Sequence, residues 1–427
     1  MRASDMAFLK CWAGVLAVFL IAVATFNLVI DPYGFFGYVI RGVNDVKPRP
    51  DTNLTALKRA ALERIQPTAL ILGNSRADVG FDPNHPGWAA KSLSAFNLAV
   101  PGDTIVAAWR NLEWATHHTK PRFAVVGVDF IDFIGIPDWR AEFSGDAEEP
   151  AVPLAVKLKS LFSLTALRYS GETLRVRTDP FGATITRRGF NPLRDYIPIA
   201  QHDGYYVLFR QRAEQNARRL VSQPEQTTFA FDRRNSAANE ALRRIIELCG
   251  REHIELHLVI YPYHAQMQLL FYEANLWQPY ERWKRYLAGV VRSSASVATR
   301  VTLWDFSGFD AYSTEAIPAR GDTRTQLDYY WEAGHFKSTL GDLVLDRVLD
   351  YRSFILPGFG VVLTPETVDE RVNDERDALM RYRAEHPRVA DEARDIVDAQ
   401  CRAFSNAVAA RCPAKSTAGR RTLAPSG

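Results

Sequence analysis

The chain has 427 residues, of which 47% are hydrophobic and 24% are charged. This length exceeds a typical single domain, and the apolar content is ample for a large core. The net charge of +3, without a dense Lys/Arg stripe interleaved with aromatic residues, argues against nucleic acid as a partner. Four cysteines are too few for a disulfide framework. Cys401 and Cys412 fit either a pair formed in an oxidising compartment or two lone thiols near a tail.

The first predicted element is an uncharged apolar helix over residues 11–30. Its length matches the hydrocarbon core of a bilayer, and it lacks the cleavage site of a signal peptide. We therefore expect residues 1–34 to form a single-pass membrane anchor, with a buried soluble helix as the alternative. Positive charges flank both ends and do not fix the orientation. A short stub before a long domain is the usual layout of a signal anchor and places the domain outside the cytoplasm, in the periplasm.

Strand-like and helical segments alternate after the anchor. Continuous apolar runs predict strands over residues 68–72 and 123–128, and further short segments rich in apolar residues predict strands over 95–98, 254–261 and 301–306. Apolar residues at helical spacing predict helices over residues 54–64, 104–117, 236–252, 278–293 and 338–349. Such strands, alternating with helices, indicate a parallel sheet covered on both faces. The predicted fold class is therefore α/β.

Two segments depart from this alternation. Residues 137–234 are irregular and rich in Gly, Pro and Arg, with one helix predicted over residues 156–167. We interpret them as an insertion in an α/β domain that spans residues 55–356. Residues 357–427 are predicted to form a charged helical extension over 366–411, followed by a disordered tail.

Two short segments carry the candidate chemistry. Residues 68–78 read TALILGNSRAD, where a predicted strand ends at a glycine and Ser75 follows. Residues 328–336 read DYYWEAGHF, with Glu332 three residues before His335. A hydroxyl, a base and an acid that orients the base are the set that acyl transfer through a serine requires. Ser75, His335 and Glu332 are therefore the candidate catalytic residues.

This order of motifs resembles the SGNH (GDSL-like) hydrolase superfamily, and within it the membrane-anchored branch related to alginate O-acetylation and D-alanyl-lipoteichoic acid biosynthesis proteins. Residues 73–75, GNS, match the block that carries the family's nucleophile. Residues 332–335, EAGH, match its DxxH block with Glu in place of Asp. Gly102, in NLAVPGDT, matches a glycine whose amide binds the oxyanion. Residues 127–129, GVD, stand where the family has GxN, so Asp129 replaces an oxyanion-binding Asn.

The resemblance covers about residues 65–135 and 240–355, and it implies a three-layer α/β/α domain with a parallel sheet. It implies serine-dependent acyl-ester transfer or hydrolysis on an envelope or extracellular carbohydrate polymer, with a membrane O-acyltransferase as a partner. The oxyanion hole would consist of the Ser75 and Gly102 amides, with Asp129 at the altered position, where an ionised carboxylate cannot donate. Neither a metal nor an organic cofactor is implied.

The same residues also fit structural roles. Ser75 fits a helix N-cap, His335 a hydrogen-bonded structural histidine, and Gly102 a turn with positive φ. Asp129 and Asp132 fit either a metal-binding carboxylate pair or the caps of neighbouring loops. These alternatives remain open at the level of sequence.

Three further residues are candidate substrate contacts. Arg76 follows the predicted nucleophile. Tyr261 and His264 lie in YPYH at the carboxyl end of a predicted strand, where parallel sheets bind ligands. Because the Asn of the third block is missing, the alternative function is a non-catalytic SGNH-like scaffold that binds an envelope polymer or a membrane O-acyltransferase partner.

The insertion has residue types that suit an acceptor site. It contains the Arg187–Arg188 pair and the aromatic residues Tyr205, Tyr206 and Phe209. A transferase must exclude water or outcompete it by positioning the acceptor. We therefore expect the insertion to cover the site.

Overall fold

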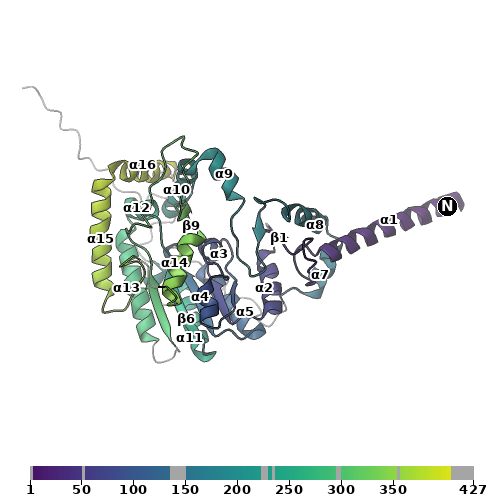
Figure 1. Cartoon of the computed structure of the whole chain (residues 1–427), viewed down its shortest axis with the longest axis horizontal. Coiled ribbons are helices and arrows are strands. Elements are labelled where there is room, and N and C mark those ends of the chain that lie inside the picture. Colours follow the sequence, from purple (N-terminus) through teal and green to yellow (C-terminus); the bar gives the residue numbers. More distant parts are fainter. Residues whose placement is uncertain are drawn as a thin grey trace, which may run out of the picture.

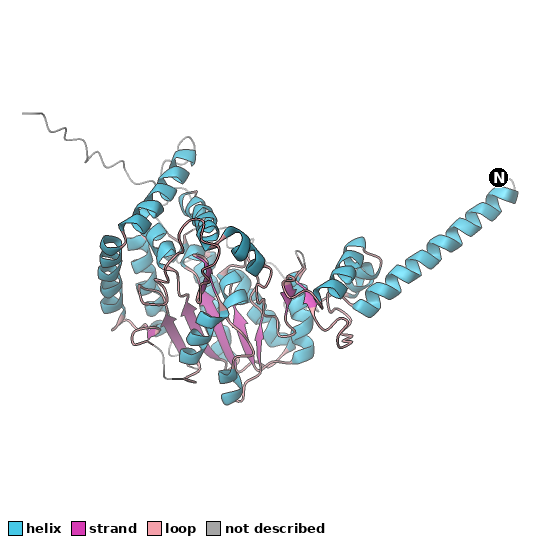
Figure 2. Cartoon of the chain, turned by 45° about the horizontal axis from the view of Figure 1, so that its top comes forward, coloured by secondary structure: helices cyan, strands magenta, loops and turns pink. Residues whose placement is uncertain are grey.

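The molecule consists of a long N-terminal helix and a body built around one sheet (Figure 1). The computed structural model describes residues 3–50, 53–134, 151–222, 229–232, 236–294, 300–352 and 356–404. The long helix, α1 (Ala3–Ile30), projects away from the body, and a small group of elements lies between its inner end and the sheet (Figures 1 and 2).

The central sheet is mostly parallel. Its strands are β3 (Ala95–Asn97), β2 (Ala69–Leu72), β4 (Phe123–Val128), β6 (Glu255–Ile260), β7 (Val301–Asp305) and β10 (Val361–Val362). They lie in the order β10-β7-β6-β4-β2-β3, and only β10 runs antiparallel to its neighbour. Every residue of β2 and β4 is buried, so both faces of the sheet are covered. The prediction of an α/β fold with a mostly parallel sheet is confirmed.

Helices enclose the sheet in one continuous apolar core. They include α2 (Leu54–Ile65), α3 (Ser75–Gly80), α4 (Pro86–Ala90), α5 (Ile105–His118), α11 (Ala237–Arg251), α12 (Ala265–Glu273), α13 (Trp277–Ser293) and α14 (Ser338–Val348). Helices α5 and α11 pack on each other, and they also contact β2 and β6 respectively. Helix α3 leaves the end of β2 and packs against α14.

The segment predicted as an insertion is divided between two places. Helices α7 (Leu154–Leu161) and α8 (Leu164–Val176) pack on α1, and β5 (Thr184–Ile185) pairs with β1 (Lys47–Pro48). Helices α9 (Tyr196–Asp203) and α10 (Tyr205–Val221) instead join the main core. The single helix predicted over 156–167 is broken because Ser163 caps α8 with its hydroxyl oxygen, which accepts from the Ala166 amide.

The charged C-terminal helices are part of the core. Helices α15 (Val368–Glu385) and α16 (Pro387–Phe404) are separated at Pro387, and each buries apolar residues such as Leu379 and Val397. The fully buried ammonium of Lys284 joins Asp305 at the end of β7 to Glu375 on α15, at 2.8 and 2.5 Å. Residues 405–427, with the predicted tail and Cys412, lie outside the described residues, so the Cys401–Cys412 pairing stays a prediction.

Helix α1 matches the predicted apolar N-terminal helix. Residues Asp5–Ile30 include an 18-residue stretch with a mean hydropathy of 2.5, and most of that stretch is exposed to solvent. By length and composition it is the one helix among the described residues that could cross a membrane.

Candidate active site

Ser75 lies at a sharp junction between β2 and α3. The strand ends at Leu72, and Gly73 turns the chain with a φ of +138°. The Asn74 side chain caps α3 by accepting from the Arg76 amide at 3.0 Å. Ser75 is the first helical residue, so its amide has no intrahelical acceptor. The residue that caps the helix is Asn74, which leaves the Ser75 hydroxyl available for other contacts.

His335 comes to Ser75 from a small hairpin. Strands β8 (Tyr330–Glu332) and β9 (His335–Phe336) pair antiparallel, with Glu332 opposite His335. The distance from His335 Nε2 to Ser75 Oγ is 2.7 Å, and His335 Nδ1 is hydrogen bonded to Glu332. An ionised carboxylate only accepts, so Nδ1 carries the proton and Nε2 accepts from the hydroxyl. The three predicted catalytic residues therefore lie together in hydrogen-bonded order.

Glu332 is buried among several donors. Its carboxylate accepts from His335 and from the Gly334 amide, and Oε1 lies 3.0 Å from Nε of Arg212. Burial alone would raise the pKa of Glu332, but His335, Arg212 and the Gly334 amide together lower it. The acid is therefore held in its charged form beside the base. Arg212, on α10, was not predicted from the sequence.

A glycine contact brings the two halves of this site together. Gly341 of α14 packs directly on the backbone of Gly80 in α3, where a Cβ would overlap the Gly80 carbonyl. Likewise, a Cβ on Gly80 would overlap the ring of Phe336, the residue after His335. Both positions need glycine for α14 and the His335 hairpin to approach α3 this closely.

Tyr261 lies beneath the nucleophile and is not part of the lining of the cleft that contains Ser75. It is fully buried, and its hydroxyl occupies the space where a side chain on Gly73 or Gly127 would stand. Burial raises its pKa far above the usual range, so the hydroxyl stays neutral. The structure therefore places Tyr261 as a support for the backbone at Gly73, before Ser75, and at Gly127 on the neighbouring strand β4.

Asp129 is a buried centre of hydrogen bonds behind Ser75. One oxygen pairs with the Arg76 guanidinium and accepts from Asn74 at 2.8 Å. The other accepts from the Tyr263 hydroxyl at 2.8 Å and from the Ile131 amide at 3.2 Å. Arg76 is itself buried and lies over the Tyr263 ring at 5.3 Å. The predicted substrate contact Arg76 and the predicted oxyanion residue Asp129 are thus ion-paired with each other.

The neighbouring acid Asp132 caps a helix. Its carboxylate accepts from the Ile105 amide at 3.0 Å and so caps α5. Burial, followed by the charge of Asp129, raises its pKa well above the usual range. Within the described ranges, no group of three or more His, Cys, Asp or Glu residues could hold a metal ion.

His264 has a structural environment away from the cleft at Ser75. His264 is fully buried, contacts the Glu315 carbonyl through Nε2 at 2.9 Å, and accepts from the Gln266 amide through Nδ1 at 3.1 Å. Burial lowers its pKa to about 4, which fits a neutral structural histidine.

Gly102 lies in an exposed turn with a φ of +85°. This turn is tied to the nucleophile loop because the Val100 amide donates to the Gly73 carbonyl at 3.2 Å.

Ser75 and His335 open into a cleft of about 650 Å³. Its polar lining includes Arg49, Asn53, Thr55, Asn191, Tyr196 and Arg212, and its apolar lining includes Leu54, Val79, Val100, Pro101, Leu193 and Ile199. One wall therefore comes from the segment that follows α1 and β1, and another comes from the predicted insertion. Gly102 adjoins this lining through Pro101.

The insertion residues that were predicted to cover the site lie elsewhere. Tyr205 and Phe209 are buried in the main core. Tyr206 donates its hydroxyl to Glu392 on α16 at 2.9 Å. Arg188 donates to the Ala95 carbonyl at 2.9 Å, and Arg187 lines two other cavities. Within the described part of the insertion, residues 191–199 and Arg212 line the cleft.

A buried ion pair under the cleft was also missed by the sequence analysis. Lys58 of α2 is fully buried and lies 2.6 Å from the Asp78 carboxylate of α3. The other oxygen of Asp78 accepts from the Asn191 amide group at 3.1 Å. These contacts hold α3, α2 and the insertion at fixed positions around Ser75. The sequence signals these contacts only by placing Lys58 on the face of the amphipathic helix α2 that is buried.

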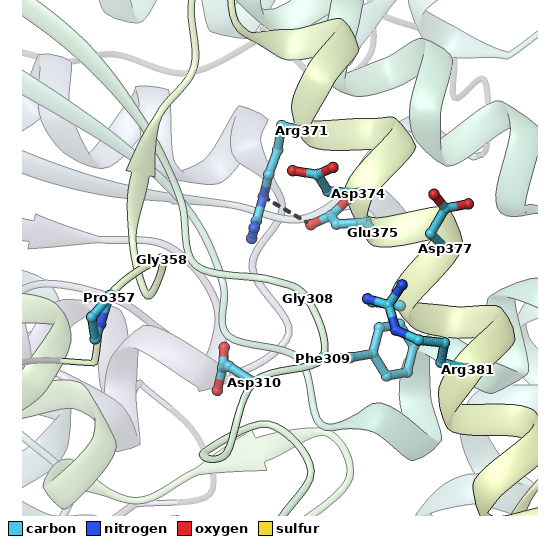
Figure 3. A pocket seen from close by; sticks show the side chains of 11 residues that line it. Gly308, Phe309, Asp310, Pro357, Gly358, Arg371, Asp374, Glu375, Asp377 and Arg381 are labelled. Carbon is cyan, nitrogen blue, oxygen red and sulfur yellow. Dashed lines mark ion pairs between the residues drawn. The ribbon is translucent and has the colours of Figure 1, made fainter.

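A second cavity, of about 330 Å³, lies between the loop after β7 and α15 (Figure 3). Charged side chains dominate its lining, including Asp310, Asp374 and Arg381. Arg371, which also lines it, is ion-paired with Glu375 at 3.3 Å and with Asp305 at 3.1 Å. The cavity is lined by neither Ser75 nor His335, so it is separate from the hydrogen-bonded triad.

The arrangement around Ser75 has the parts of a nucleophilic serine site. A hydroxyl is hydrogen bonded to an imidazole, and the imidazole is oriented by a buried carboxylate. No protein-family model, no curated protein and no solved structure matches the chain. The function therefore has to be argued from this geometry.

Proposed function

We propose that the protein is a serine-dependent acyl-ester transferase or esterase. The observation that supports this most strongly is the 2.7 Å hydrogen bond between Ser75 Oγ and His335 Nε2, at the base of an open cleft. Ser75 and His335 are far apart in sequence, and Glu332 orients the imidazole from the opposite side. A serine with a purely structural role does not require this combination of a base, an orienting acid and an open cleft.

In the proposed reaction, Ser75 Oγ attacks the carbonyl carbon of an acyl ester while His335 Nε2 takes the hydroxyl proton. Glu332 stabilises the imidazolium that forms. His335 then gives the proton to the leaving alcohol as the ester bond breaks, and the acyl group remains on Ser75. Next, water or an acceptor hydroxyl gives its proton to His335 and attacks the acyl-serine. The proton finally returns to Ser75 when the product ester or acid leaves.

The oxyanion would be bound by the backbone amides of Ser75 and Gly102. The Ser75 amide is free of helical hydrogen bonds, and the Gly102 turn is joined to the Gly73 carbonyl through Val100. Asp129 would act indirectly, because its carboxylate is bound to Asn74 and Arg76 next to the nucleophile. Losing one oxyanion donor typically costs about 10²- to 10³-fold in rate.

The proposed substrate is an acyl ester of an envelope or extracellular carbohydrate polymer. Amide and hydroxyl side chains in the cleft, among them Asn53, Thr55 and Asn191, suit a hydroxyl-rich acceptor. Helix α1 would hold the catalytic domain at a membrane, on its extracytoplasmic (periplasmic) side, where such polymers occur. By the resemblance to the SGNH superfamily, a membrane O-acyltransferase would be the partner that supplies acyl groups.

One observation favours a second candidate, a non-catalytic scaffold that binds an envelope polymer. The third sequence block has Asp129 instead of Asn, and this side chain accepts hydrogen bonds through both oxygens. It therefore offers no donor to an oxyanion. If two amide donors are too few for turnover, the same cleft would bind acyl or sugar groups without reaction.

Non-additivity of mutations tests the proposed reaction. Ser75→Ala and His335→Ala should each reduce hydrolysis of a small acetyl ester to background, and the double variant should be scarcely slower than either. When two residues act as one unit, removing either one already removes the contribution of both. Additive losses in kcat/KM would therefore contradict the proposal that Ser75 and His335 act together. Melting temperatures of the three variants within a few degrees of wild type provide the control for folding.

A further inference from the structure

An exposed apolar surface surrounds the inner end of α1. We name it the juxtamembrane patch and define it by Tyr38, Ile40, Leu154, Leu158, Phe162 and Leu164, all of which are exposed. We propose that this patch inserts into the headgroup region of the bilayer that α1 crosses. The domain would then be attached to the membrane at two places, by the spanning helix and by a shallow interfacial surface.

Helix α7 is the main part of the patch, and it has no buried residue. Leu154, Leu158 and Phe162 recur every four residues and are 70%, 52% and 54% exposed, so they form one apolar stripe. A helix of two turns is marginal in water unless its apolar face is packed. Contiguous exposed apolar residues of this kind mark an interaction site.

The patch is fixed to the end of α1 by buried amides. Asn27, in the last turns of α1, donates to the Leu161 carbonyl at 2.9 Å and accepts from the Ser170 hydroxyl at 2.9 Å. Asn44 does the same for the other part of the patch, because its side chain donates to the Ile30 and Tyr38 carbonyls at 2.9 and 3.1 Å. The α7–α8 corner and the Tyr38 segment therefore stay where α1 would leave the hydrocarbon core (Figures 1 and 2).

The charges around the patch favour lipid over protein as its partner. Residues 151–171 contain no Asp or Glu and carry Lys157, Lys159 and Arg168. Apolar side chains flanked by basic ones are typical of interfacial helices, which add attraction to anionic headgroups to apolar burial. The aromatic ring of Tyr38 suits the same depth.

Photocrosslinking in the full-length protein tests this placement. The photoreactive amino acid p-benzoylphenylalanine would replace Leu158 or Leu164 in protein reconstituted into phosphatidylethanolamine and phosphatidylglycerol vesicles. Phe19, within α1, serves as the position in the hydrocarbon core. Met380, which is 40% exposed on α15 far from α1, serves as the matched exposed position on the body. After irradiation, mass spectrometry identifies what is attached at each position.

We expect phospholipid adducts at positions 19, 158 and 164 and none at position 380. Lipid adducts at position 19 alone would overturn the proposal, because α7 would then lie in water. A crosslink from position 158 to another copy of the chain would overturn it in favour of a protein interface. No lipid adduct at any of the four positions would remove the spanning role of α1 and the proposal with it. None of these outcomes depends on the reaction proposed for Ser75.

Discussion

At the scale of single residues, Glu332 contacts both the proposed base, His335, and the guanidinium of Arg212. Its carboxylate is hydrogen bonded to His335 and lies 3.0 Å from Arg212. These partners and the Gly334 amide lower its pKa in spite of burial, so it stays charged at neutral pH. In the proposed reaction, this negative charge beside Nδ1 would stabilise the imidazolium that forms when His335 takes a proton from Ser75.

Replacing this charge with a neutral group should separate activity from folding. Glu332→Gln keeps an oxygen that accepts from His335 but cannot stabilise the imidazolium. We expect kcat to fall by roughly 10²- to 10⁴-fold while the melting temperature changes little. Glu214→Gln, which removes an exposed partner of Arg210 on α10, is the matched control and should keep full activity. Equal activity of the two variants would show that Glu332 has no role in the reaction.

The residue scale also shows what the sequence could and could not predict. Ser75, Glu332 and His335 lie in short local patterns, so they could be picked out without a structure. Arg212 belongs to a different segment of the chain and meets Glu332 only because α10 packs beside β8. Tyr261 and His264 were selected for their place after a strand, but burial of both shows that position along a strand does not decide which way a side chain faces.

At the scale of elements, α3, which carries Ser75, packs against both β9, which carries His335, and α14, which follows β9. Gly341→Ala should push α14 away from the Gly80 backbone. We expect a loss of about 1–3 kcal/mol in the free energy of unfolding, typical of overpacking, together with a large loss of activity. The matched control is Gly289→Ala in α13, where a Cβ would have no neighbour within 4 Å. Chemical denaturation and ester hydrolysis measured on both variants check the prediction. A Gly341→Ala protein with wild-type activity would refute it.

Helix α15 should depend on its buried ion pair. Glu375→Gln removes one carboxylate from the fully buried Lys284 and should cost about 3–5 kcal/mol, because a charge is left short of its partner. Asp391→Asn on α16 breaks an exposed pair with Arg394 and should cost less than about 1 kcal/mol. Urea denaturation of both variants measures the difference. Equal midpoints would mean that α15 is only loosely attached to the body.

Element boundaries were more predictable than element partners. Strands β2, β4, β6 and β7 lie within one or two residues of the predicted ranges. For β2 and β4 this is because burial on both faces demands a continuous apolar run. The C-terminal helices were predicted as an extension since their charges dominate the composition. Only a narrow stripe of apolar residues on these helices is buried. Nothing in the sequence next to Lys284 or Glu375 indicates that the two side chains pair. The contact of Gly80 with Gly341 is equally invisible, because neither glycine is marked by its neighbours.

At the scale of the whole molecule, α1 should fix the compartment of the domain. Its 26-residue segment Asp5–Ile30 is apolar and long enough to span a bilayer. We expect the protein to stay in membranes after carbonate extraction, and alkaline phosphatase fused after Gly427 to be active, as it is only outside the cytoplasm. The same fusion lacking residues 3–30 is the control and should be inactive. An inactive full-length fusion would place the domain in the cytoplasm and contradict the envelope-polymer proposal.

The most direct test of the central proposal is covalent labelling of the folded, full-length protein with a fluorophosphonate. This reagent reacts with a serine whose hydroxyl is activated by a base, so it reports the Ser75–His335 pair without knowledge of the substrate. We predict one adduct, found by mass spectrometry on the peptide with Ser75, with much slower labelling in His335→Ala and none in Ser75→Ala. Absence of the adduct from folded wild-type protein would contradict the proposal and leave the scaffold as the better account.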